Sequence, residues 1–160
     1  MAVYVRRLFG IGKLPDDLRA QVEAEGIVYL ADYVAVTRRF SGAVPGLRSA
    51  RSVASYVGSL VFTSERVLAT LSSLPKLAGR AVDVRWDAPQ NGAANAEISP
   101  TGLHVDLDVA DVDPRFSGHL SLHYKARIPG DVLTGLPRHT LTFQVPPQFV
   151  LRAVGVPYRP

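Results

Sequence analysis

Apolar residues alternate with polar ones in short stretches along most of the chain from residue 27 onward. This period of two is typical of strands that have one buried and one exposed face. In the clearest stretch, Val82, Val84 and Trp86 alternate with charged residues. Strands are predicted over residues 27–40, 53–62, 67–71, 81–86, 96–99, 103–109, 119–127 and 140–145.

Glycine and proline mark the breaks between these strands. Residues 41–51 contain two glycines and a proline and predict a loop, residues 72–79 predict a connection, and residues 87–94 predict a turn. Within the first strand the even positions form one apolar row, which Asp32 interrupts. The row consists of Val28, Leu30, Val34, Val36 and Phe40.

One helix is predicted near the N-terminus. Pro15 suits the first helical position, and the two aspartates that follow it suit the positive end of the helix dipole. Leu14, Leu18 and Val22 recur at helical spacing, and Gly26 ends the pattern. The helix is only about three turns long, so we expect it to need packing against the rest of the domain.

The remaining segments complete a mainly β (α+β) fold with short terminal helices. Residues 132–133 predict a helical turn, residues 148–154 a short helix, and residues 1–13 an edge strand or a tail. No βαβ crossover lies between the strands, which favours an antiparallel barrel or sandwich of seven or eight strands. We expect one domain, with an N-terminal segment and helix (1–26) and a barrel with a short C-terminal extension (27–160).

Composition narrows the class of protein. A chain of 160 residues fits one domain with a sizeable core, and the absence of cysteine excludes disulfides and thiolate sites. No apolar run approaches the ~18 residues of a membrane span, and no signal peptide is recognised, so we expect a cytoplasmic protein. The net charge of +4 favours anionic partners, but the basic residues are too scattered to indicate nucleic-acid binding.

The segment from Gly58 to Leu71 consists of two apolar strands joined by the polar turn Thr63–Arg66. This glycine, strand, Thr-x-x-Arg turn and second strand resemble the hairpin of GRAM-type and bacterial pleckstrin-homology-like (PH-like) domains, and the resemblance covers roughly residues 27–135. It implies seven antiparallel strands in a bent, partly open barrel capped by a C-terminal helix. The chain departs from this pattern, because prolines and glycines in residues 129–137 leave at most two helical turns there, and a further strand follows.

Four arginines occupy the first two strands of this region and the residues between them: Arg38, Arg39, Arg48 and Arg51. In PH domains that bind phosphoinositides, basic residues in the matching region surround the headgroup, and guanidinium groups can grip phosphate oxygens bidentately. The alternative is four solvated arginines on a flexible loop. Since most bacterial relatives are not known as inositide binders, we expect a non-enzymatic interaction module, without a cofactor, that docks to an acidic lipid surface or a protein partner.

Two later strands carry histidines and aspartates on one face. A register that places Asp108 opposite His119 also places His104 opposite His123, and Asp106 lies on the same face. This set would suit zinc or another divalent ion. The alternative is a solvated outer face with cross-strand charge pairs, and the sequence does not fix the register.

Two further functions stay open at this point. A hydrolytic enzyme would use Ser121, which lies between His119 and His123 in the same row, although residues two apart on a strand are about 7 Å from each other. A lipocalin-like barrel would instead hold a small hydrophobic ligand among its aromatic side chains. The residues do not reveal the oligomeric state or the identity of a partner.

Overall fold

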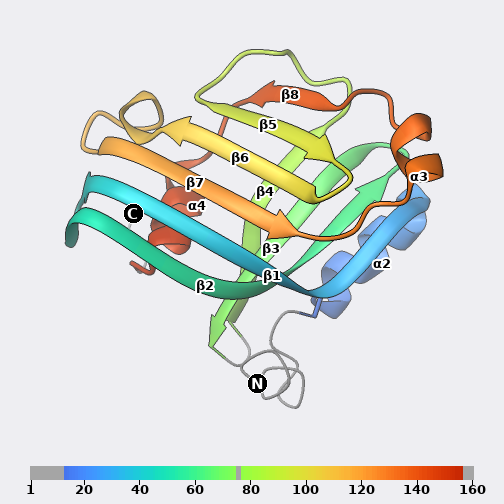
Figure 1. Cartoon of the computed structure of the whole chain (residues 1–160), viewed down its shortest axis with the longest axis horizontal. Helices are drawn as coiled ribbons and strands as arrows, with labels where there is room; N and C mark the ends of the chain where they lie inside the picture. Colours follow the sequence, from blue (N-terminus) through green and yellow to red (C-terminus); the bar gives the residue numbers. More distant parts are fainter. Residues whose placement is uncertain (1–12, 75–76, 157–160) are drawn as a thin grey trace.

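The chain forms one antiparallel sheet that curls into a nearly closed barrel (Figure 1). The computed structural model describes the backbone of residues 13–74 and 77–156. The eight strands lie in the order β4-β3-β2-β1-β7-β6-β5-β8, which confirms the predicted mainly β fold. They are β1 (Ile27–Val44), β2 (Leu47–Thr63), β3 (Arg66–Leu74), β4 (Leu77–Arg85), β5 (Ala94–Ser99), β6 (Gly102–Asp108), β7 (Ser117–Lys125) and β8 (Thr140–Phe143).

The helices lie where the sequence predicts them. They are α2 (Asp16–Glu25), α3 (Gly130–Gly135) and α4 (Pro147–Val154), with a 3-10 turn, η1 (Val109–Asp111). Helix α2 follows Pro15 and ends at Gly26, whose φ of 92° explains why glycine occupies that position. The edge strand or tail that is predicted over residues 1–13 lies, up to residue 12, outside the described part of the chain.

The two longer helices pack on opposite faces of the sheet. Leu18 and Val22 of α2 are buried on the outer face against a small cluster that includes Val61 and Leu68. Helix α4 joins the main core through residues such as Val150 and packs mainly against β4, the edge strand at the barrel opening. The sheet therefore has a filled inner side and an outer side that α2 covers only in part (Figure 1).

Strand β1 reverses its faces near Tyr33, and this overturns part of the predicted apolar row. The register with β2 shifts between Ala31 and Val34, and Tyr33 has a φ of 59°. From Val34 onward the even positions face the core, whereas Leu30 packs under α2 and Val28 is exposed. The bulge is the physical reason, because one extra residue moves every following side chain to the other face.

The predicted loop over residues 41–51 is wrong. Strand β1 continues to Val44 and β2 begins at Leu47, so only Pro45 and Gly46 separate them. Gly42 is needed inside the strand, because a Cβ there would lie 1.9 Å from the backbone oxygen of Ser117 on β7. Glycine here allows close strand contact and does not mark a loop.

The predicted connection over residues 72–79 is also too long, since β3 continues to Leu74 and β4 begins at Leu77. By contrast, the predicted turn between residues 63 and 66 is confirmed. The hydroxyl oxygen of Thr63 accepts hydrogen bonds from the backbone N–H groups of Glu65 and Arg66, each at 3.0 Å. The threonine of the Thr-x-x-Arg turn thus closes the turn itself.

The arginine of this turn fastens α2 to the barrel. The guanidinium of Arg66 contacts Glu25 of α2 at 2.8 Å and Asp83 of β4 at 3.1 Å. Burial alone would lower the pKa of Arg66, but hydrogen bonds and charge from these two carboxylates raise it overall. Thr63 and Arg66 therefore have structural roles in this fold.

Candidate functional site

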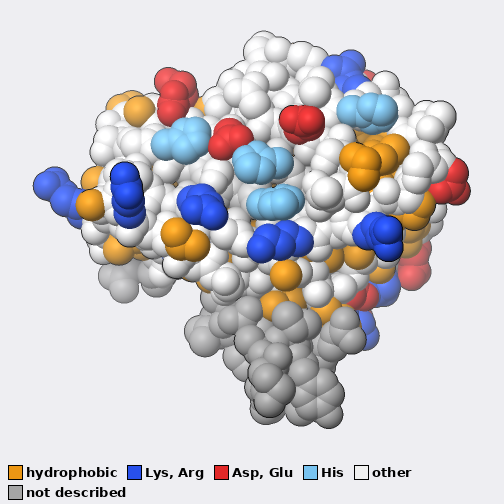
Figure 2. Space-filling view, in the orientation of Figure 1, with side chains coloured by type: hydrophobic (Ala, Val, Ile, Leu, Met, Phe, Trp, Pro, Cys, Tyr) orange, Lys and Arg blue, Asp and Glu red, His pale blue; other side chains and the backbone are white. Residues whose placement is uncertain are grey.

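The open part of the outer face extends over β2, β1, β7 and β6, beyond the end that α2 covers. Strand pairing places Arg39 of β1 opposite Val53 of β2 on one side and opposite Ser121 of β7 on the other. Ser121 in turn lies opposite Asp106 of β6. Figure 2 looks onto this outer face, where histidine side chains gather between acidic groups and a row of basic groups.

Two of the predicted arginines meet in a shallow pocket of about 310 Å³ on this face. Arg39 and Arg51 are both exposed, and His119 of β7 lies at the same pocket. We name it the basic pocket; its lining is Arg39, Phe40, Ser41, Arg51, Ser52, Val53 and His119. Arg48 is exposed on the same face, where β2 begins, opposite Ala43.

Arg38 does not share this surface, and the expectation that it would is wrong. Adjacent residues of a strand point to opposite faces, so Arg38 faces the interior and is only 4% exposed. Its Nη2 donates to the hydroxyl of Ser52 at 2.8 Å, and the guanidinium lies 5.9 Å from the centre of the Tyr56 ring. Its Nε and Nη1 have no hydrogen-bond partner among the described residues.

The histidines and aspartates of β6 and β7 form what we call the histidine–aspartate cluster: His104, Asp106, Asp108, His119 and His123. The predicted register is confirmed, with Asp108 opposite His119 and His104 opposite His123. His119 lies between the two carboxylates, with Nε2 at 3.1 Å from Asp106 and Nδ1 at 3.3 Å from Asp108. Nε2 of His104 lies 2.9 Å from the other oxygen of Asp106, so this carboxylate contacts two histidines.

The surroundings shift the pKa values of two of the histidines in opposite directions. Burial tends to lower the pKa of His119, but hydrogen bonds to Asp106 and Asp108 outweigh it and raise the pKa. Both ring nitrogens can donate to carboxylates only in the protonated form. The pKa of His123 is lowered, by partial burial first and then by the neighbouring His104 and Lys125. The rings of His104 and His123 lie 5.6 Å apart between their centres.

The cluster has neither a metal-site geometry nor a catalytic one within the described part of the chain. Among the described residues, no group of three histidine, aspartate or glutamate side chains converges as metal ligands would, either in this cluster or elsewhere. Among the described residues, Ser121 makes no hydrogen bond to a histidine, and the cluster lies on a solvent-exposed strand surface that meets only the shallow basic pocket, through His119. The arrangement matches the predicted alternative of cross-strand charge pairs on a solvated face.

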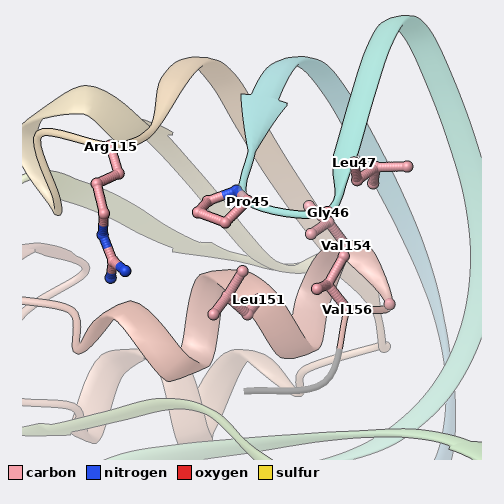
Figure 3. Close-up of a pocket in the computed structure, with 8 residues that line it drawn as sticks. Pro45, Gly46, Leu47, Arg115, Leu151, Val154 and Val156 are labelled. Atoms are coloured by element: carbon pink, nitrogen blue, oxygen red, sulfur yellow. The ribbon is translucent and has the colours of Figure 1, made fainter. Parts of the chain in front are cut away.

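Between α4 and the sheet, the described side chains leave a small cavity of about 10 Å³, which is roughly the space that one water molecule needs. A larger pocket of about 490 Å³ opens at the end of the barrel, between the β1–β2 turn and α4 (Figure 3). Arg115, the charged side chain among the described residues that line it, is paired with Asp113 at 2.9 Å.

The contribution of His119 to the basic pocket could not be anticipated from the sequence. It depends on the pairing of β1 with β7, which places Ser41 opposite His119 although the two strands are far apart along the chain. Comparison with known proteins finds no family model, no curated protein and no solved structure that matches this chain. Within the described residues, no helix has the length and apolar character needed to cross a membrane.

Proposed function

We propose that this protein is a non-enzymatic interaction module that docks onto an acidic lipid surface through the open outer face. The observation that carries the proposal is the basic pocket, where Arg39 and Arg51 lie exposed beside Val53. The Val53 side chain is 62% exposed although it is apolar. Basic groups around an exposed apolar side chain suit the boundary between lipid headgroups and acyl chains.

The expected strength of membrane binding follows from the number of basic residues on this face. Each basic residue held near an anionic membrane contributes about 1 kcal/mol, so Arg39, Arg48 and Arg51 together supply about 3 kcal/mol. None of the three has an acidic side chain opposite it in the described strand pairing. Their guanidinium groups therefore remain available to phosphate oxygens.

Two further points support the proposal. The hairpin from Gly58 to Leu71 resembles that of PH-like domains, and a barrel of antiparallel strands with a helix at its opening agrees with what that resemblance implies. The exposed arginines belong to the strands that bear the headgroup site in lipid-binding members. A cytoplasmic location, where membranes carry acidic lipids, is part of the same proposal.

Sedimentation with lipid vesicles tests the proposal. The protein should bind vesicles of phosphatidylcholine and phosphatidylglycerol in equal parts, bind phosphatidylcholine alone much more weakly, and dissociate as salt increases. The double variant Arg39→Gln/Arg51→Gln should bind about 25-fold more weakly, and adding Arg48→Gln should weaken binding about fivefold further.

A matched control has the same loss of charge elsewhere on the molecule. Arg85 and Arg138 are exposed and lie outside the basic pocket, so Arg85→Gln/Arg138→Gln should retain nearly full binding. An equal loss in both double variants would show that only net charge matters and would overturn the assignment to this face. Absence of vesicle binding in the unmodified protein would overturn the lipid proposal in favour of a protein partner.

A further inference from the structure

Arg38 is a buried positive charge that forms no ion pair within the described part of the chain. The residue is only 4% exposed, and it faces the interior of the barrel. Its Nη2 donates to the hydroxyl of Ser52, but Nε and Nη1 are buried and donate to no described group. A buried charge without a counter-ion is strongly unfavourable. An anion that pairs with this guanidinium would remove that cost.

The described neighbours of Arg38 offer hydrogen-bond donors and no acidic group. Strand pairing places it opposite Ala54 of β2 and Leu122 of β7, which are both uncharged. The Tyr56 ring lies with its centre 5.9 Å from the guanidinium carbon, and the Tyr56 hydroxyl makes no hydrogen bond to a described residue. Two guanidinium N–H groups and a phenol O–H group are thus left to bind an anion.

The pocket of about 490 Å³ at the end of the barrel lies next to these groups (Figure 3). Gly155 lines this pocket, and a Cβ at Gly155 would lie 3.7 Å from the hydroxyl oxygen of Tyr56. The Tyr56 side chain therefore stands between the pocket and Arg38. The described lining is mainly apolar: Pro45, Leu47, Leu151, Val154 and Val156. An apolar pocket of this volume, with a few polar groups at one end, is typical of small-molecule sites.

We propose that this pocket binds a carboxylate with an apolar chain, such as a medium-chain fatty acid, and that Arg38 is its counter-ion. The chain lies along the apolar lining, and the carboxylate faces inward, where it accepts hydrogen bonds from Tyr56 and Arg38 after a rotation of the Tyr56 side chain. The rim is the weaker place for this group, because Arg115 is already paired with Asp113. One negative charge balances one guanidinium, so a carboxylate suits the site better than a phosphomonoester.

Calorimetric titration with decanoate at about pH 7.5, where the carboxylate is ionised, tests the inference. Decanol is the reference ligand, because it has the same chain without the charge. The unmodified protein should bind decanoate at least about tenfold more tightly than decanol. Arg38→Met should bind decanoate about 10- to 100-fold more weakly and lose this preference. Tyr56→Phe should bind decanoate about fivefold more weakly and decanol as before.

Arg39 provides a matched control, since it is the next residue of β1 but is exposed on the outer face. Arg39→Met should keep full decanoate binding, whereas Arg38→Met should bind vesicles like the unmodified protein because Arg38 faces the interior. The inference is therefore independent of the proposed docking function. Circular dichroism should show each variant folded, and methionine is well suited to a buried position.

Three results would overturn the inference: no binding of decanoate, equal binding of decanoate and decanol by the unmodified protein, or equal losses in the Arg38 and Arg39 variants. The first two results are obtained without any substitution, so they do not depend on how the variants fold. Decanoate binding that needs Arg38, together with an absence of vesicle binding, would support the inference and overturn the docking function alone.

Discussion

Replacement of Arg66 by methionine tests whether the Thr-x-x-Arg turn holds the fold together. The Arg66 side chain is 12% exposed, and its ion-pair partners Glu25 and Asp83 are 16% and 17% exposed. Methionine fills part of the same space but provides no charge. The variant Arg66→Met therefore leaves two mostly buried carboxylates without their shared cation.

The expected loss of stability follows from the partial burial of these three side chains. Removing one partner of a fully buried pair costs about 3–5 kcal/mol, whereas a surface pair contributes about 0–1 kcal/mol. The Arg66 pairs lie between these limits, so the free energy of unfolding should fall by about 2–3 kcal/mol. For a chain of 160 residues this lowers the melting temperature by about 5–10 °C.

Urea unfolding at neutral pH, followed by circular dichroism, measures the loss. Arg85 is the matched control, because it also pairs with two acidic residues but its side chain is 58% exposed, so Arg85→Met should change the free energy of unfolding little. Amide exchange in α2 should accelerate only in the Arg66 variant, since Arg66 joins that helix to the barrel. Equal, small losses in both variants would refute the structural role assigned to Arg66.

Two more substitutions test the packing and the charge of the barrel. An added Cβ at Gly58 would lie 1.9 Å from the backbone oxygen of Thr70, so Gly58→Ala should lower the free energy of unfolding by about 2–3 kcal/mol in urea, whereas Gly130→Ala, which has open space, should change it little. The raised pKa of His119 stabilises the fold fully below pH 6.5, and this gain is lost as the pH rises through the folded-state value. His119→Gln should thus be less stable than the unmodified protein in acid, by less than about 1 kcal/mol at this exposed site, and a stability difference that does not vary with pH would contradict the assignment.

Alternation and turn chemistry were sufficient to predict most of the fold. The row Val82, Val84 and Trp86 faces the core as expected, and α2 begins and ends as Pro15 and Gly26 predict. The register that places His104 opposite His123 is one that the sequence leaves open, because the segment between the two strands does not fix it, and the pairing of β6 with β7 confirms it.

The wrong predictions have a different origin, because they concern residues whose positions depend on contacts between distant segments of the chain. Gly42 was interpreted as a loop residue, but it lies in β1 because Gly118 of β7 passes close to it. The reversal of faces at Tyr33 has no clear signal in the local pattern. The resemblance groups Arg38 with Arg39 by region alone, although the two point to opposite sides of the strand. When the buried face of a strand changes along its length, the sequence alone does not show which residues face the core. The pairing with the neighbouring strands is needed to decide this.

The hairpin that carries the resemblance and the surface proposed to bind lipid are different parts of the molecule. The polar atoms of Thr63 and Arg66 contact the turn, α2 and β4. These two residues of the hairpin therefore stabilise the fold. Arg39 and Arg51 lie on the open outer face, where substitution removes charge without disturbing the core. Since a fold does not determine its binding partner, the resemblance alone cannot decide which ligand this barrel takes. The residues proposed to bind lipid are those of β1, β2 and β7 that face solvent, and binding and stability should therefore respond to separate sets of substitutions.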